Sequence, residues 1–252
     1  MKRRTPFAIL AFLGLALTAG GVLAQMQADT PAQAQTPTPT QAPAQSQTYN
    51  NSLRLGVYII KYNAKADDIQ GPFVPPGASL DVNDTNTLYF AYVRRINKDF
   101  DVEFALGIPP KTETVGKGPA TLGSAPFNGQ VLATAKWFSP SVLLQYKFLE
   151  EGSTWRPYLG VGFNFTHFYD IQSTAAGDAV TGGPTKTTLT NSFTYAVNAG
   201  VSYHIDGPWH AYASVNYAPV NSKATLETGG VTRTTTIHFD PTAYVLSVGY
   251  SF

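Results

Sequence analysis

The chain of 252 residues contains no cysteine, so no disulfide can stabilise it. Charged residues make up only 13% of the chain, against roughly 25% in an ordinary soluble domain. Beyond residue 24 the sequence also lacks any apolar run long enough to span a bilayer as a helix. Aromatic residues, by contrast, account for another 13%. High aromatic content, little charge and no helical span together favour a membrane β-barrel over a soluble domain.

Residues 1–24 have the pattern of a cleaved secretory signal peptide. Three basic residues, Lys2 to Arg4, precede an apolar core from Phe7 to Leu17, and Val22-Leu23-Ala24 offers a cleavage site. The alternative, an uncleaved anchor, is disfavoured because the core is short for a membrane span. Cleavage leaves 14 basic and 16 acidic residues, a net charge of about −2. Such a chain has no basic surface for nucleic acid, and we expect no nucleic-acid partner.

Residues 25–51 are predicted to form a disordered tether in front of the barrel. The stretch from Gln25 to Thr48 consists almost wholly of Gln, Ala, Thr and Pro. Such a composition cannot bury a core, so the segment is expected to stay extended. A passive spacer is the favoured interpretation, and contact with peptidoglycan or another periplasmic partner is the alternative.

Eight stretches of the remaining chain alternate bulky apolar residues with small or polar ones. In the last stretch, Tyr244, Leu246, Val248, Tyr250 and Phe252 all share one parity. A period of two places such residues on one face of a β-strand. The eight predicted strands are about Leu53–Tyr62, Thr87–Arg95, Phe100–Ile108, Ser141–Phe148, Arg156–Phe168, Phe193–Ile205, Trp209–Ala218 and Tyr244–Phe252.

The links between these strands alternate between short and long. Residues 97–99, 150–155 and 206–208 are short links, whereas those after Tyr62, Ile108, Phe168 and Ala218 are much longer. An even number of strands with short turns at one end and long loops at the other is typical of outer-membrane barrels. The sequence therefore predicts an all-β fold over residues 52–252: an eight-stranded antiparallel, up-and-down transmembrane β-barrel in the outer membrane of a Gram-negative bacterium.

The apolar parity is predicted to face lipid, because its aromatic residues gather at both ends of the strands. Tyr92, Tyr146 and Trp209 lie near the short turns, and Phe163, Phe193 and Tyr244 lie near the long loops. Two aromatic bands are what the two membrane interfaces favour. The terminal Phe252 resembles the signal by which such barrels are handed to their assembly machinery. Outer-membrane lipid and that machinery are the expected partners.

The opposite parity is predicted to line the lumen in two zones. The upper zone is mostly apolar or neutral, with glycines that leave space, and includes Tyr58, Ile60, Tyr89, Leu143, Gly160, Gly162, Asn164, Asn198 and Asn216. The lower zone carries charge and includes Arg54, Glu103, Lys147, His204 and His210. We expect a small pocket above an ion-paired floor, since charges out of bulk water need partners. An interior packed solid throughout is the alternative.

Such a pocket would favour small, uncharged, apolar solutes, and a charged floor would hinder their passage straight to the periplasm. A sideways exit through the barrel wall into the membrane is the expected route. The loops contain the apolar, proline-rich stretches Gly71–Gly77 and Ile108-Pro109-Pro110. Proline removes a ladder donor, so strand pairing is expected to be interrupted there.

The stretch Arg156-Pro157-Tyr158-Leu159-Gly160-Val161-Gly162-Phe163-Asn164-Phe165-Thr166 resembles the OmpW family of small outer-membrane barrels. Shorter matching pieces are Leu144–Phe148, Ala199-Gly200-Val201, Asp240-Pro241 and Gly249–Phe252. The resemblance covers about residues 52–252. It implies an eight-stranded barrel that takes up small hydrophobic compounds, with relatives that import alkanes. It does not extend to the loops, and the N-terminal tether is longer than the family leads us to expect.

The remaining signals favour no enzyme, metal or cofactor. Gly160-x-Gly162 lies inside a strand and opens no helix, so it predicts no nucleotide site. His204 and His210 could bind a metal, but a hydrogen-bonded pair in the lower lumen is favoured. A lipid A-modifying enzyme would need a serine near His167 or His238, for which Ser173 and Ser192 are the candidates. A structural or adhesive barrel, or a phage or bacteriocin receptor without transport, is the other alternative.

Overall fold

The computed structural model describes residues 49–119, 121–122 and 125–252. The predicted signal peptide lies outside the described residues, as does the predicted tether up to residue 48. No helix within the described ranges is both long and apolar enough to cross a membrane.

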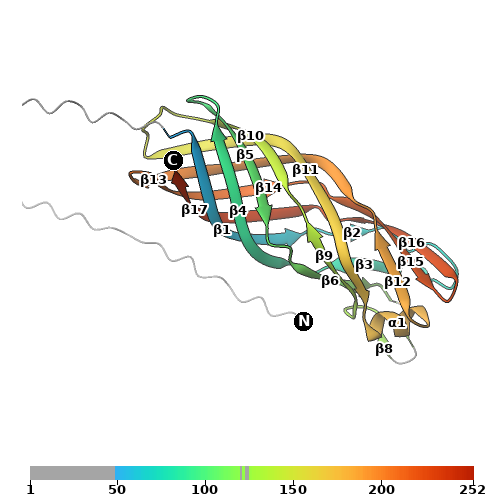
Figure 1. Ribbon diagram of the computed structural model, residues 1–252. Coiled ribbons are helices and arrows are strands. Elements are labelled where there is room, and N and C mark those ends of the chain that lie inside the picture. The colour runs from blue at the N-terminus through green and yellow to red at the C-terminus, as the bar shows by residue number, and fades with distance from the viewer. Residues whose placement is uncertain (1–48, 120, 123–124) are drawn as a thin grey trace, which may run out of the picture. The chain divides into compact units, whose positions relative to one another are not determined.

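Eight antiparallel strands close into a barrel, which confirms the predicted fold (Figure 1). Neighbouring strands follow the chain order around the barrel, so the topology is up-and-down, and β1 pairs with β17 to close it. The barrel strands are β1 (Asn51–Tyr62), β4 (Thr85–Arg95), β5 (Phe100–Gly107), β10 (Ser141–Lys147), β11 (Trp155–Ser173), β13 (Ser192–Asp206), β14 (Trp209–Tyr217) and β17 (Pro241–Ser251).

Alternation along each strand sorts the side chains between the lumen and the outer surface. On β1, Leu53 and Leu55 are exposed on the outside, whereas Arg54 between them is buried inside. Aromatic pairs form at the short-turn end, where the rings of Trp155 and Tyr203 lie 4.5 Å apart between centroids. The stacked rings of Phe163 and Phe193, 5.6 Å apart, belong to the opposite end. The apolar outer face with aromatic residues at both ends is the surface that a lipid bilayer requires.

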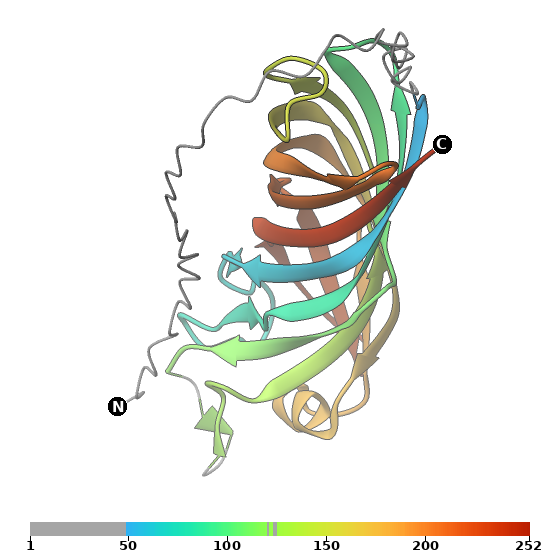
Figure 2. The same ribbon diagram turned by 90° about the vertical axis from the view of Figure 1, so that its left-hand side faces the viewer.

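Beyond the barrel, the long loops form two larger sheets and one two-stranded sheet, which the sequence did not predict. Figure 1 shows this extension at the end opposite the C-terminus, and Figure 2 views the molecule from the end at which the C-terminus lies. In one sheet, the outer part of β11 pairs with β9 (Val131–Phe138), which pairs with β6 (Lys111–Lys117) and through it with β3 (Ser79–Val82). The other sheet has the order β12 (Thr185–Leu189), β15 (Asn221–Thr228), β16 (Val231–His238) and β2 (Lys65–Ala66).

The threonine-rich loop segments account for these extra strands, because threonine is β-branched and suits a pleated sheet. The hairpin of β15 and β16 turns at Gly229-Gly230, where both residues have positive φ, 54° and 81°. Such a turn matches the twist of the flanking strands. The short helix α1 (Ala175–Thr181) and the two-residue strands β7 (Thr121–Leu122) and β8 (Ala125–Pro126) complete the extension.

The extension has an apolar core of its own between its two larger sheets. Its buried members come from both sheets and from the segments that join them to the barrel: Ala64, Ala78, Leu80, Val82, Phe127, Phe168, Val220, Ala224, Ile237 and Phe239. The core therefore starts at the open end of the barrel and continues away from the membrane-spanning strands.

Candidate functional site

A network of buried charged side chains closes the lumen near the short-turn end; we call it the charged floor. Nη1 of Arg54 donates to Oε2 of Glu103 at 2.5 Å, and both side chains are at most 3% exposed. Gln145 donates to the same carboxylate oxygen at 3.1 Å, and Lys147 forms an ion pair with Asp101. Each charge thus has an opposite charge within reach, as burial in a low-dielectric interior requires.

The aromatic rings of Tyr158 and Tyr212 complete this floor. The guanidinium of Arg54 lies over the ring of Tyr212, 3.8 Å from its centroid, and 5.9 Å from that of Tyr158. Both rings are buried in the lumen. Cation–π contacts of this kind hold the guanidinium in one place and fill the cross-section around it.

Not all of the residues predicted for the lower lumen lie in the charged floor. Arg54, Glu103 and Lys147 belong to the floor. His210 is half-buried and His204 is exposed, with their ring centroids 5.0 Å apart across the short turn. One ring nitrogen of His204 bonds to the carbonyl oxygen of Gly207 at 3.0 Å.

Sequence reasoning missed Asp101 and Gln145 as members of the floor. Asp101 shares its parity with Glu103 on β5, and Gln145 shares its parity with Leu143 and Lys147 on β10. The period of two already contained this signal.

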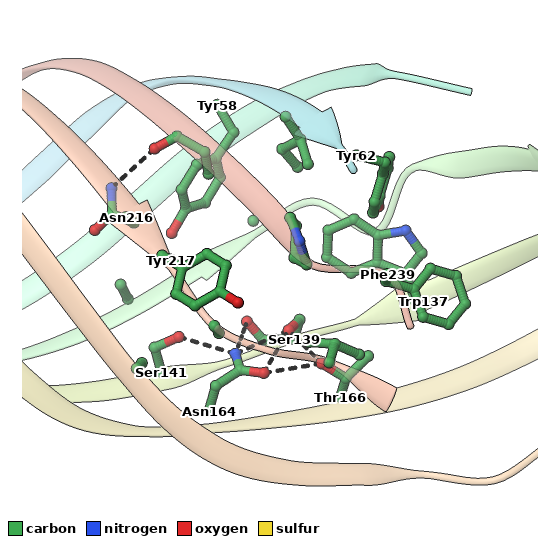
Figure 3. A pocket seen from close by; sticks show the side chains of 18 of the residues that line it. Tyr58, Tyr62, Trp137, Ser139, Ser141, Asn164, Thr166, Asn216, Tyr217 and Phe239 are labelled. Atoms are coloured by element: carbon green, nitrogen blue, oxygen red, sulfur yellow. Dashed lines mark hydrogen bonds between the residues drawn. The ribbon is translucent and has the colours of Figure 1, made fainter. Parts of the chain in front are cut away.

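Above the floor lies a cavity of about 90 Å³, the lumen pocket. Five of the predicted lumen residues line it, namely Tyr58, Ile60, Leu143, Asn164 and Asn216. Figure 3 shows the rings of Tyr62, Trp137 and Phe239 gathered across the pocket from a polar group that includes Asn164. The lining is therefore mostly apolar and aromatic, with one polar side.

Tyr89, Gly160, Gly162 and Asn198 do not line the pocket, although they face the lumen. Tyr89 is buried and packs edge-on against Tyr58, with centroids 4.9 Å apart. The two glycines were expected to leave space in the lumen, but neighbouring atoms already lie where their side chains would be. A Cβ on Gly162 would lie 1.9 Å from the carbonyl oxygen of Val142, and one on Gly160 would lie 2.2 Å from Oδ1 of Asn198. Glycine is needed at position 162, where the close atom belongs to the backbone, whereas at position 160 the end of the Asn198 side chain would have to turn away.

Asn164 holds the polar side of the lumen pocket together. Its amide nitrogen donates to Oγ of Ser139 at 2.9 Å and to Oγ of Ser141 at 3.0 Å. Its amide oxygen accepts from the hydroxyl of Thr166 at 2.9 Å. Because these groups satisfy one another, this side of the pocket presents few free polar atoms to a solute.

The barrel wall beside the lumen pocket is interrupted. Pairing of β5 with β10 ends at Ala105 and Ser141, and pairing of β6 with β9 begins at Lys111 and Lys136. Between these points no ladder partners join residues 106–110 to residues 137–140, all of which the structure describes. We call these two segments the wall interruption.

Proline accounts for the wall interruption, since Pro109, Pro110 and Pro140 have no backbone N–H to donate. The neighbouring Gly107, Trp137 and Ser139 belong to the same segments and line the lumen pocket. The pocket therefore abuts a part of the wall where no ladder hydrogen bonds join the two segments to each other.

In the described part of the chain, no hydrogen bond joins a serine to a histidine among the residues considered for an enzyme. A ring nitrogen of His167 bonds to Oδ1 of Asn191 at 2.8 Å, and one of His238 bonds to Oδ1 of Asn221 at 2.6 Å. The hydroxyl of Ser192 accepts from the backbone N–H of Asn221 at 3.2 Å. Among the described residues no three His, Cys, Asp or Glu side chains are grouped so as to hold a metal ion.

The sequence comparisons place the chain among small outer-membrane proteins. The model of the OmpW family matches residues 52–252. Outer membrane protein W of Vibrio cholerae serotype O1 is 29% identical over 203 residues, which cover 79% of this chain and 87% of that protein. The dibenzothiophene metabolism operon protein PahQ of Pseudomonas aeruginosa is 31% identical over 118 residues, covering 46% of this chain and 52% of that protein.

Solved structures show the same fold. The outer membrane protein OprG from Pseudomonas aeruginosa superposes with a TM-score of 0.72 at 22% identity, covering 81% of this chain and 96% of that one. The outer membrane protein AlkL, solved in lipid bilayers, gives a TM-score of 0.63 at 21% identity, covering 84% of this chain and 95% of that one.

Proposed function

Since this chain belongs to the OmpW family of outer-membrane barrels, we propose that it mediates passive uptake of small hydrophobic molecules. The solute enters the lumen pocket from the extension and leaves sideways through the wall interruption into the outer membrane. No covalent step or energy source takes part. The position of the pocket carries this proposal, because it is mostly apolar, lies above a sealed floor and abuts an unpaired part of the wall.

The lining of the lumen pocket supports an apolar solute. Pockets for small molecules combine apolar and aromatic walls with a few placed polar groups. Here the walls include Tyr58, Trp137 and Phe239, and the polar group around Asn164 is internally satisfied. A hydrated ion would lose its water shell in this pocket and find no opposite charge among the lining residues. The pocket therefore discriminates against ions.

The floor supports the sideways exit. A solute moving straight toward the periplasm would have to break the Arg54–Glu103 pair, which leaves two buried charges unpaired. A solute that moves sideways between residues 106–110 and residues 137–140 breaks no ladder hydrogen bond. The relative PahQ is named for an operon of dibenzothiophene metabolism, and dibenzothiophene is an apolar aromatic compound. A solute of this class suits the aromatic lining described above.

Uptake by intact cells tests the proposal. Gram-negative cells without their own OmpW-family proteins would express this chain and receive radiolabelled naphthalene or a small ionic solute. We expect faster naphthalene entry than in cells with an empty vector, and unchanged entry of the ion. Ala243→Phe, which narrows the pocket, should slow naphthalene entry, whereas Val248→Phe on the outer face of the same strand should not. Equal acceleration of ion and naphthalene would instead indicate a water-filled pore. No acceleration of either would favour an adhesive or receptor role.

A further inference from the structure

A second and larger cavity, of about 220 Å³, lies within the extension. We call it the extension cavity. Its lining comes from both extension sheets and from α1, with Leu80, Ala133 and Ile171 from one sheet and Ala224 and Leu226 from the other. It shares no lining residue with the lumen pocket. It is therefore a separate space, outside the membrane-spanning strands.

A layer of large side chains separates the two spaces. Phe168 and Phe239 are both buried, and their rings stack with centroids 5.2 Å apart. The ring of Tyr62 lies against Phe239 at 6.2 Å. All three line the lumen pocket and pack into the apolar core of the extension. A molecule in the extension cavity would thus be held apart from the lumen until this layer moves.

The size and lining of the extension cavity suit an apolar molecule. An apolar cavity of about 150 Å³ stays dry and binds benzene, so about 220 Å³ has room for a ligand somewhat larger than one ring. Phe73 is 88% exposed at the edge of this cavity, in a loop where its φ of 61° is unusual for a bulky residue. A ligand in the cavity would cover part of this exposed ring.

Arg233 is the one charged side chain that lines the cavity, whose other lining residues are apolar apart from six threonines and one serine. Its Nε donates to the carbonyl oxygen of Pro72 at 3.0 Å. Its Nη1 is shielded from solvent and has no hydrogen-bond partner in the described part of the chain, nor does any described carboxylate lie within ion-pair distance of the guanidinium. A shielded donor without a partner is costly, and an acceptor on a ligand would remove that cost.

We propose that the extension cavity is a second binding site, selective for small apolar molecules that carry one acceptor group, best a carboxylate. The apolar body fills the space between the sheets, and the Arg233 side chain, which lines the cavity, turns its unpaired Nη1 donor toward the acceptor. An aromatic carboxylate of two rings meets both requirements. This site does not depend on uptake through the lumen, because it is a separate cavity. Unlike the lumen pocket, it is lined by a charged side chain.

Methyl NMR of the protein in lipid nanodiscs tests the proposal with two probes, 2-naphthoate and naphthalene. Free probe concentrations are measured in parallel with empty nanodiscs. Methyls of Ile69, Leu80 and Leu132 report on the extension cavity, and those of Ile60 and Leu143 report on the lumen pocket. We expect 2-naphthoate to shift the extension methyls and to bind there about tenfold more tightly than naphthalene, since a charge-assisted hydrogen bond distinguishes the two.

Substitutions of Arg233 test whether this side chain causes the preference for 2-naphthoate over naphthalene. Arg233→Gln should remove the tenfold preference and leave naphthalene binding unchanged, and Arg233→Lys should keep most of the preference. Arg94→Gln, an exposed arginine at the other end of the barrel, is the matched control and should behave as the unaltered chain. Ala133→Phe should fill the cavity and abolish both shifts.

Two outcomes would overturn the inference. Equal affinity for the two probes in the unaltered chain contradicts the role of Arg233. Shifts confined to Ile60 and Leu143 mean that the lumen pocket binds and the extension cavity does not, which leaves the proposed uptake intact. Shifts confined to the extension methyls support the second site and count against the lumen pocket.

Discussion

Arg54 on β1 and Glu103 on β5 are separated in the barrel wall by β4, yet their side chains meet inside the lumen at 2.5 Å. Arg54 is also stacked on Tyr212 of β14. Contacts from opposite sides of the barrel thus converge on one guanidinium. This arrangement makes the floor a cross-brace as well as a seal, and its parts depend on one another.

Glu103→Ala is expected to be strongly destabilising, because it leaves Arg54 buried and unpaired. Breaking a buried ion pair in this way costs about 3–5 kcal/mol. The double change Arg54→Met with Glu103→Leu should cost less, since no charge then remains unpaired. Urea unfolding in lipid vesicles measures both. Lys61→Ala, which breaks the exposed Lys61–Asp84 pair, should cost under about 1 kcal/mol. A loss for Glu103→Ala no larger than for this control would contradict the bracing role.

Gly162→Ala is expected to impair folding more than Gly107→Ala. An added Cβ at Gly162 would meet backbone atoms of Val142 at 1.9 Å, which only a shift of the strand can relieve. At Gly107 the closest atom would be 3.2 Å away. Overpacking costs about 1–3 kcal/mol, and the backbone clash places Gly162→Ala at or above the upper end. The fraction of folded barrel on unheated gels measures the difference. Equal folded fractions would show that β10 and β11 can move apart freely.

The barrel was predictable from the sequence because each strand is recognised by the alternation of residues that are neighbours in the chain. Each spanning strand places one parity in lipid, so a period of two in residues such as Leu53 and Leu55 reveals the strand and its outer face. The floor followed from the same period, since Arg54, Glu103 and Lys147 lie on the inner parity.

The extension and the lumen pocket's upper wall were not predictable in the same way. Residues such as Thr187 and Thr234 lie in strands with no apolar alternation long enough to distinguish them from a loop. Trp137, Phe168 and Phe239 come together only because β9, β11 and the segment after β16 converge above the barrel. Contacts between residues so distant in the chain depend on the register of the extension sheets, which sequence periodicity does not specify.

The ion pair of Lys136 and Asp170 is expected to make the extension sensitive to acid. Their side chains lie 2.9 Å apart, outside the membrane-spanning part of β11. The hydrogen bond from Lys136 lowers the pKa of Asp170, and that bond to Asp170 raises the pKa of Lys136. A carboxyl whose pKa is lowered by folding stabilises the fold above its unfolded pKa, about 3.9, and loses this contribution as the pH falls through the lower folded value.

Hydrogen exchange of β9 and the outer part of β11 measures this effect. After correction for the intrinsic pH dependence of amide exchange, we expect protection to fall below about pH 4 in the unaltered chain, with a smaller change in Asp170→Asn. Both groups are well exposed, so the effect should be small and should weaken in high salt. An identical acid response in Asp170→Asn would assign the sensitivity to another carboxyl group.

Linking the two sides of the wall interruption is expected to stop uptake of apolar solutes. The chain has no cysteine of its own, so Leu106→Cys with Pro140→Cys introduces the only two thiols. Leu106 and Pro140 lie next to Ala105 and Ser141, the last paired residues of the two strands. Both positions have the parity that faces outward. A short bis-thiosulfonate linker should lower naphthalene entry to that of cells without the protein, and a reductant should restore it. The control Phe104→Cys with Val142→Cys links the same strands where they already pair, and uptake should not change. Full uptake through a linked interruption would mean that solutes leave the lumen by another path, and the sideways exit would be wrong.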